Sequence, residues 1–139
     1  MPSDQTFVDA NVLVYHLVQQ DHEHGPPSSR LLARLRAGAE EAFLSSTAVF
    51  ECIFICDRNY GIPRPDLANA IIEILSFRGL STDHPEALVD ALRFWGTQGP
   101  LSFADCFHLA LAKQLGMKRI YSFDQKMNRY PGVERIEPA

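Results

Sequence analysis

The chain has 139 residues, the length of one domain, so residues 1–139 are expected to form a single unit with its own core. A composition of 46% hydrophobic and 22% charged residues excludes a disordered chain, and no apolar run approaches the ~20 residues of a membrane-spanning helix. With a net charge of −4, the chain has no excess of basic residues to bind nucleic acid. If four of the 17 acids held a metal ion, however, the remaining acids would be balanced by the 13 basic residues.

Taken in chain order, short apolar segments alternate with stretches of helical periodicity. Strands are predicted at residues 6–8, 42–44, 80–82, 119–123 and 132–136. Helices are predicted at residues 11–19, 28–37, 47–59, 65–79, 85–95 and 103–115. Ser46 or Thr47 is the expected cap of the third helix. This alternation predicts an α/β fold, in which helices cover both faces of a mostly parallel sheet.

The three cysteines, Cys52, Cys56 and Cys106, all lie in apolar stretches, and no CxxC or HxxxH pattern accompanies them. Reduced, buried thiols are therefore expected rather than a zinc site. The first residues lack the basic start and apolar stretch of a signal peptide. Together these features predict a cytoplasmic protein with no membrane partner.

Four acidic residues stand among apolar ones, where an ionised carboxylate is costly to desolvate without a partner. Asp9 and Asp124 follow predicted strands, whereas Glu51 and Asp105 lie near the starts of predicted helices. In an open parallel sheet these ends meet at one crevice, so the four side chains are expected to cluster. Clustered carboxylates repel one another unless a cation joins them, and oxygen-only ligands suit Mg²⁺ or Mn²⁺. Because such ions activate water for phosphodiester hydrolysis, the pattern predicts a metal-dependent nuclease.

Three of the four acids have an alternative role in capping helices. Asp9 could cap the helix that follows it, and Asp124 could cap the short turn after it. Ser102 with Asp105 three residues later matches a capping box. Glu51 has no such role, because the residue three positions before it is an alanine. Glu51 therefore best separates a metal site from a set of caps.

The segments around the four acids form motifs in a fixed order. A strand ends in Asp–x–Asn, a Glu follows a run of Ser and Thr, an Asp opens an apolar helix, and Ser–x–Asp follows a late strand. The motifs occupy residues 7–15, 45–51, 102–112 and 122–124. In this order and spacing, nearly the whole chain resembles the PIN-domain family, and within it the toxin ribonucleases of the VapC type.

The resemblance implies a three-layer α/β/α sandwich around a central, mostly parallel sheet of about four or five strands. It also implies a Mg²⁺- or Mn²⁺-dependent endoribonuclease, the toxin of a type II toxin–antitoxin pair, with RNA as substrate and an antitoxin protein as partner. Asp9 and Asp105 would be the principal catalytic metal ligands, completed by Glu51 and Asp124.

Two polar neighbours would support these ligands. By the same resemblance, Asn11 and Ser122 would orient carboxylates or water, and Ser122 stands where the family more often has threonine. A homodimer is also expected, from the resemblance and from the apolar residues of 67–75, which cover more than a narrow stripe of their helix.

Two other functions fit parts of the pattern. A phosphatase of the haloacid-dehalogenase type would explain Asp9 after a strand, but it needs a second acid where this chain has Asn11. A non-catalytic PIN-like module would bind RNA or protein without cutting it. A metal titration separates this module from the enzyme, because a binding module need not respond to Mn²⁺.

Overall fold

The computed structural model describes residues 5–97 and 99–139. Within these residues the chain has five short strands, six α-helices and one 3₁₀ helix. The strands are β1 (Thr6–Phe7), β2 (Ala42–Phe43), β3 (Leu80–Ser81), β4 (Arg119–Tyr121) and β5 (Glu134–Ile136). The helices are α1 (Ala10–Val18), α2 (Gly25–Ala37), α3 (Ser46–Tyr60), α4 (Arg64–Leu75), α5 (Pro85–Thr97), α6 (Phe103–Gln114) and the 3₁₀ helix η1 (Gln125–Arg129).

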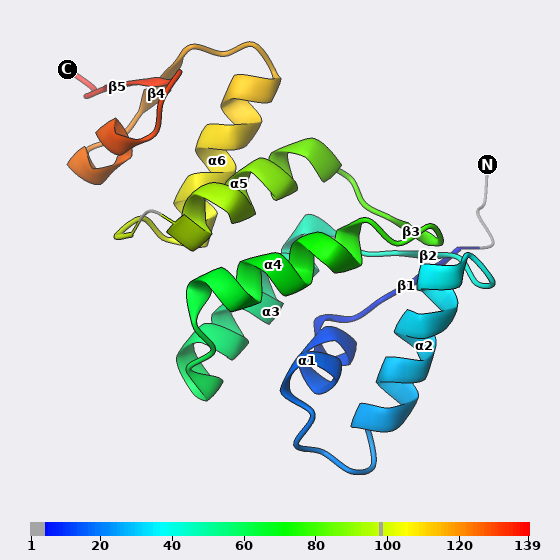
Figure 1. Ribbon diagram of the computed structural model, residues 1–139. Coiled ribbons are helices and arrows are strands. Elements are labelled where there is room, and N and C mark those ends of the chain that lie inside the picture. The colour runs from blue at the N-terminus through cyan, green and yellow to red at the C-terminus, as the bar shows by residue number, and fades with distance from the viewer. Residues whose placement is uncertain (1–4, 98) are drawn as a thin grey trace.

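The strands pair in parallel and form two sheets. β2 lies between β1 and β3, with Thr6 opposite Ala42 and Ala42 opposite Leu80. β4 pairs with β5 in a second sheet beyond α6, at the upper left of Figure 1. The predicted α/β class and parallel pairing are confirmed. The strands are divided into three and two, however, where one central sheet was expected.

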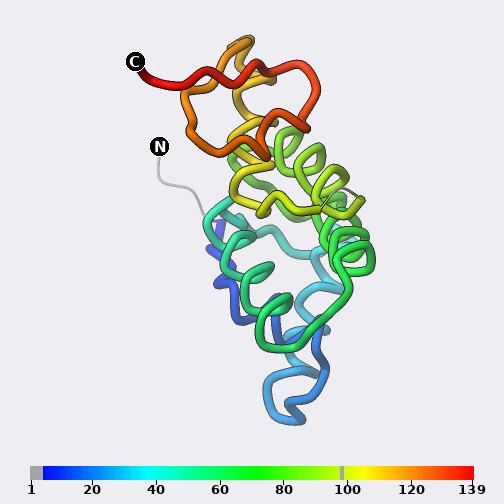
Figure 2. Tube along the Cα trace, turned by 90° about the vertical axis from the view of Figure 1, so that its left-hand side faces the viewer, coloured from blue at the N-terminus to red at the C-terminus, as the bar shows by residue number. Residues whose placement is uncertain are grey.

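A stack of helices accounts for this division. α5 packs against both α4 and α6 (Figure 1). Because β4 follows directly after α6, the stack carries β4 away from β1 and holds it at one end of an elongated molecule (Figure 2). β1 and β4 are therefore not paired with each other.

Three helix ends differ from the predicted ones by more than one residue. α2 begins at Gly25, so it includes Pro26 and Pro27, which suit a first turn because its N–H groups have no acceptor within the helix. α4 ends at Leu75, before the predicted stop. α5 continues through Gly96, where the missing side chain permits close packing on α4, since a Cβ there would lie 3.0 Å from that of Ala68.

Aromatic side chains fix α3, α5 and α6 relative to one another. The ring of Phe50 on α3 meets those of Phe103 and Phe107 on α6 edge-on, with centroids 5.4 and 5.1 Å apart. Trp95 of α5 is buried and packs edge-on against Phe103. Each such pair adds roughly 0.5–1.5 kcal/mol beyond the burial of its area. These aromatic contacts hold α3 against the start of α6.

The apolar residues of α4 are mostly internal. Leu67 and Ile71 are buried, so this helix does not present the apolar excess on which the expected dimer partly rested. The most exposed large apolar side chains of the described residues lie in or just beyond β1 and β4: Phe7, Tyr121 and Phe123 are 72%, 73% and 70% exposed. No helix within the described ranges is both long and apolar enough to cross a membrane.

Three segments converge at Gly79: the end of α2, the loop before β2, and the start of β3. A glycine is required there. Its N–H donates to Leu35 O and its carbonyl accepts from Ala42 N, both at 2.8 Å, and a Cβ at this position would collide with Glu40 O. We expect Gly79→Ala to lower the free energy of unfolding by about 2 kcal/mol or more, because backbone has to move. Urea unfolding measures the loss.

Gly61→Ala is the matched control for this prediction. Gly61 has a φ of +60°, but a Cβ added to it would meet no atom within 4 Å, so its replacement costs only backbone strain, about 1 kcal/mol. A Gly79→Ala protein as stable as Gly61→Ala would contradict the close approach.

Candidate functional site

Asp9 stands at the carboxyl end of β1, directly after the hydrogen bond from Val8 N to Phe43 O. Its Oδ2 accepts a hydrogen bond from the backbone N–H of Asn11 at 3.0 Å, so Asp9 caps α1. The capping role considered from the sequence is therefore confirmed. A cap needs one carboxylate oxygen, which leaves the other oxygen of this exposed side chain able to bind a second group.

The start of α3 lies beside Asp9, where β2 ends. Ser45 caps this helix, because its Oγ accepts a hydrogen bond from the backbone N–H of Ala48 at 3.1 Å. The predicted cap, Ser46 or Thr47, is therefore wrong by one or two positions. The reason is that the chain turns into helix as soon as the β2 ladder ends, at Leu44.

Glu51 lies one turn further along α3, and its side chain is exposed. This corrects the expectation that it lies in apolar surroundings: the buried positions of α3 face the core, and Glu51 is on the other side. Within residues 5–97 and 99–139, its carboxylate takes part in no hydrogen bond or ion pair. Glu51 caps no helix, as predicted.

Asp9 and Glu51 line the same cavity, of about 210 Å³, where β1 and β2 end and α3 begins. Ser45 and Thr47 contribute hydroxyl groups to its wall. These side chains offer only oxygen atoms, and an oxygen-only set suits a hard divalent cation such as Mg²⁺ or Mn²⁺. Among the described residues, Asp9 and Glu51 are the two predicted acids that share a cavity.

Asp83, an acid outside the four predicted ones, follows β3 at the same edge of the sheet. Its Oδ1 accepts hydrogen bonds from the backbone N–H and the hydroxyl of Ser46, at 3.0 and 2.5 Å. Partial burial raises the pKa of Asp83, but hydrogen bonds from Ser46, from the backbone N–H of Asp83 itself and from the Thr82 hydroxyl together outweigh it and leave the pKa below its ordinary value. The sequence pattern that could have identified Asp83 is Ser–Thr–Asp after a strand. It has the same Ser–x–Asp form as residues 122–124.

Asp105 lies in the first turn of α6 and is partly buried. Ser102 caps this helix as predicted, since its Oγ accepts from the backbone N–H of Asp105 at 3.1 Å. The residues just before Asp105 line a second cavity, of about 640 Å³, together with Glu51. Glu51 thus borders both the hollow that holds Asp9 and the hollow at the start of α6.

Asp124 and Ser122 lie at the end of β4, in the second sheet. Asp124 caps η1 by accepting from the backbone N–H of Lys126 at 3.0 Å, and its carboxylate lies 3.4 Å from the ammonium group of the same lysine. Ser122 Oγ accepts from the backbone N–H of Asp124 at 3.0 Å. The predicted cap is confirmed, and Ser122 orients the segment that carries Asp124.

The acids therefore do not form one cluster in this structure. Within residues 5–97 and 99–139, no three acidic, histidine or cysteine side chains are placed to hold a metal ion together. The division of the strands explains the separation, because Asp9 follows β1 and Asp124 follows β4, which belong to different sheets. The rule that the strand ends of a parallel sheet meet at one crevice holds for β1, β2 and β3. It does not apply to β4, which belongs to the other sheet.

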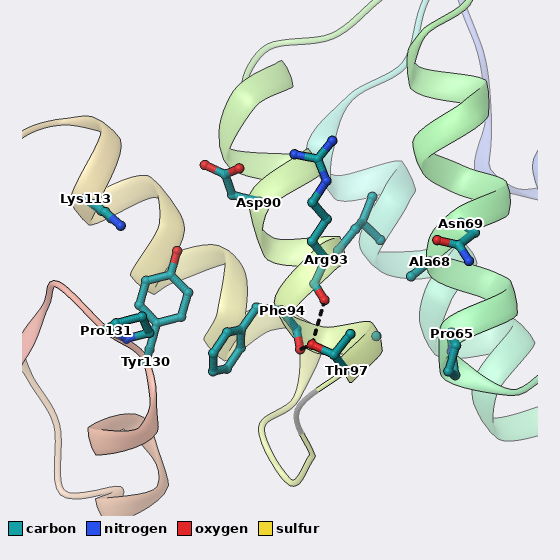
Figure 3. Close-up of a pocket in the computed structure, with 12 residues that line it drawn as sticks. Pro65, Ala68, Asn69, Asp90, Arg93, Phe94, Thr97, Lys113, Tyr130 and Pro131 are labelled. Carbon is teal, nitrogen blue, oxygen red and sulfur yellow. Dashed lines mark hydrogen bonds between the residues drawn. The ribbon is translucent and has the colours of Figure 1, made fainter.

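Another hollow, of about 620 Å³, lies away from the candidate acids (Figure 3). Residues of α4, α5, α6 and the segment after η1 line it, with Lys113 and Tyr130 on one side and Asn69 on the other. Burial and the neighbouring Asp90 raise the pKa of Tyr130, so its hydroxyl group stays protonated near neutral pH. None of the four predicted acids lines this hollow.

Cys52 and Cys106 are not candidate nucleophiles. All three cysteines are buried and free, as predicted. Burial raises the pKa of Cys106 to about 12, and a hydrogen bond with Cys56 together with burial raises the pKa of Cys52. Because the thiolate is the reactive form, Cys52 and Cys106 are unreactive near neutral pH.

Comparison with known proteins covers almost the whole chain. The model of the PIN domain family matches residues 6–133. A VapC ribonuclease of Mycobacterium bovis and ribonuclease VapC13 of Mycobacterium tuberculosis are each 28% identical to the chain over 137 residues, which cover 93% of this chain and 97% of theirs. The crystal structure of VapC20 of Mycobacterium tuberculosis, a sarcin-ricin loop cleaving toxin, covers 96% of this chain and 100% of its own, at 21% identity and a TM-score of 0.42.

The Asp83 carboxylate is expected to stabilise the start of α3 in a pH-dependent way. Asp83→Asn should lower the free energy of unfolding by about 1 kcal/mol at pH 7, because Ser46 loses a charged acceptor. The lowered pKa means that this stabilisation is present above the ordinary aspartate value of about 3.9 and is lost as the pH falls through the folded value. Urea unfolding between about pH 7 and 3 should therefore show wild type and variant converging in acid.

Glu41→Gln, an exposed position in the loop before β2, serves as the control and should leave stability unchanged at every pH. A difference between Asp83→Asn and wild type that persists at the acid end would show that the charge of Asp83 is not what matters.

Proposed function

This chain belongs to the PIN domain family, and from that membership we propose that it is an endoribonuclease, the toxin of a VapC-type toxin–antitoxin pair. The observation that carries the proposal is the pairing of Asp9 with Glu51 in one cavity at the strand ends. Similarity to two VapC ribonucleases over nearly their whole length supports RNA as the substrate. Two acids in an open hollow next to helix starts suit the hydrolysis of an exposed phosphodiester bond.

The proposed cofactor is Mg²⁺ or Mn²⁺, held by Asp9, Glu51, Asp105 and Asp124. The oxygen-only donors around the Asp9–Glu51 cavity fit such an ion. When bound, it supplies activated water and neutralises charge on the phosphate. Asp105 and Asp124 lie outside this cavity, so the proposal requires the start of α6 and the end of β4 to approach it.

The protein's own residues would bind the ion and orient the carboxylates that hold it. The Asp9 oxygen that caps α1 fixes the direction of its carboxylate, so the second oxygen is held ready for a ligand. Glu51 faces the same cavity from α3 and is free to turn, since nothing in the described residues restrains its carboxylate. Asn11 and Ser122 would act one step further out, through Asp9 and through the segment of Asp124.

Three further features belong to the proposal. A nuclease that attacks the RNA of its own cell needs an inhibitor, so an antitoxin protein is the expected partner, and the cytoplasm is the expected place of action. A homodimer is also proposed, and the exposed aromatic residues Phe7, Tyr121 and Phe123 now support it better than the buried face of α4.

Cleavage of RNA in the presence of Mn²⁺ tests the function directly. The purified protein should cut a pooled RNA, and excess EDTA should abolish the activity. Asp9→Asn and Glu51→Gln should each lower the rate by roughly 100-fold or more, because each removes a charged ligand. Glu86→Gln, in the first turn of α5 and outside both cavities lined by Glu51, is the control.

Activity that persists undiminished in EDTA would contradict the metal mechanism. A protein that binds RNA but never cuts it, with or without Mn²⁺, would instead be the non-catalytic module considered above.

Metal binding should also raise thermal stability, because the ion relieves repulsion between carboxylates. With a dissociation constant on the order of 1 mM and about 10 mM metal, linkage gives about 1.4 kcal/mol. For a domain of this size that is a rise in Tm of roughly 3–8 °C. Glu51→Gln should shrink this rise without lowering the Tm of the metal-free protein, since Glu51 is exposed and caps no helix.

Differential scanning fluorimetry with Mn²⁺ and with EDTA measures both quantities. The idea of a shared ion fails if Glu51→Gln is less stable than wild type without metal yet shifts as much with it.

A further inference from the structure

The solvent-facing side of α3 carries more than Glu51. Phe54 and Arg58 follow it by three and seven residues, which places all three on one face of the helix. Phe54 is 61% exposed, although it stands in the middle of a helix that packs on the core. The guanidinium group of Arg58 lies over the Phe54 ring, 5.2 Å from its centroid. The face thus presents an acid, an open aromatic ring and a cation in sequence along the helix.

This face borders the cavity of about 640 Å³ between α3 and the start of α6, which we call the α3 groove. Phe103 and Trp95 line it with aromatic surface, and Arg64 adds a second cation. Arg64 is held in place, because its Nη1 donates to Leu101 O at 3.2 Å and its guanidinium lies 4.9 Å from the Trp95 ring centroid. Glu51 lines both this groove and the Asp9 cavity, so the two hollows adjoin at its carboxylate.

The charges of the α3 groove favour an anionic occupant. In the part of the chain that the structure describes, neither Arg58 nor Arg64 forms an ion pair. Two acids, Glu51 and Asp57, also line the groove, so its charge is balanced while Glu51 is free. Once a metal ion takes up the charge of Glu51, the two arginines are in excess and attract phosphate.

We propose that the α3 groove binds unpaired nucleotides of the RNA next to the bond that is cut, with a base stacked on Phe54 and phosphates at Arg58 and Arg64. The proposal rests on the ribonuclease function proposed above. Aromatic rings accept the face of any base, and arginine forms charge-assisted hydrogen bonds with phosphate. The bases of a duplex are stacked on one another and are not available to Phe54, so the occupant is single-stranded.

A protein segment suits the groove less well. An apolar segment laid over it would cover Arg58 and Arg64 without offering them a negative charge, and such desolvation is costly. A strand of RNA brings a flat ring and a negative charge in each nucleotide, which matches the alternation of Phe54 and the two arginines.

Binding and cutting of one unstructured, fluorescently labelled RNA oligonucleotide test this inference. Fluorescence anisotropy in Mn²⁺, with a phosphorothioate copy of the strand that resists cleavage, gives the dissociation constant under the conditions in which the arginines are in excess, and the unmodified strand with Mn²⁺ gives KM and kcat. Phe54→Ala should weaken binding and raise KM by roughly 10- to 100-fold, and Phe54→Tyr should restore both because it keeps the ring. Arg58→Ala should weaken binding and lower the slope of log affinity against log salt by about 0.7.

Two controls match these variants. Tyr60→Ala removes an exposed aromatic ring from the same helix, and Arg119→Ala removes an exposed cation from β4, and neither residue lines the groove. Both should leave the dissociation constant and the salt slope as in wild type. Because Phe54 and Arg58 are not buried, their variants should melt close to the wild-type temperature, so a loss of binding is not a loss of fold.

The outcomes separate the groove from the function on which it rests. If the wild type binds the strand and the groove variants lose it, the groove is supported, even if no cleavage occurs and the proposed function fails. If the wild type cuts RNA and Phe54→Ala and Arg58→Ala bind and cut as well as it does, the groove is overturned while the function stands. Groove variants that keep RNA binding but lose a protein partner would overturn it in favour of a protein occupant.

Discussion

The parallel pairing of β1, β2 and β3 is the constraint on which the candidate site depends. Each of these strands is only two residues long, and the ladder is extended by hydrogen bonds from Val8 N to Phe43 O and from Leu44 N to Ser81 O, both at 2.8 Å. Because the strands run in the same direction, the chain leaves all three at one edge. The residues that follow them, Asp9, Ser45 and Asp83, each fix the start of a helix there. The acids and the helix starts are thus positioned by the same few backbone bonds.

Local signals in the sequence predict the elements well, because their causes are local. Caps depend on residues within one turn, and so the roles of Asp9, Ser102 and Asp124 are confirmed. Strand order is a different matter, since it depends on how helices far apart in the chain pack together. Nothing in the sequence near Arg119–Tyr121 indicates that the packing of α6 on α5 places β4 away from β1. The division into two sheets was therefore not predictable from the pattern. The prediction that all four acids meet relied on one sheet, and it remains a proposal.

The exposure of Glu51 has a more specific lesson. The stretch from residue 48 to 56 looks apolar on every side because Phe54 stands in it, and this pattern predicts an enclosed acid. In the structure, Val49, Cys52 and Ile53 face the core, whereas Phe54 faces solvent with the acid. Hydrophobic periodicity assumes that large apolar side chains are buried, so it fails where one is exposed. The failure therefore marks the position that is most in need of a functional explanation.

The two faces of α3 have different roles. Its buried face packs into the core through Val49, Cys52 and Ile53, and its exposed face carries Glu51, Phe54 and Arg58. Residues of the exposed face have few contacts to lose, so they are free to change without weakening the fold. Asp9 is bound more tightly to the structure, since the same carboxylate that would hold a ligand also caps α1. The site thus joins one acid that is fixed by the fold to one that is free to move, and the groove leads away from the free one.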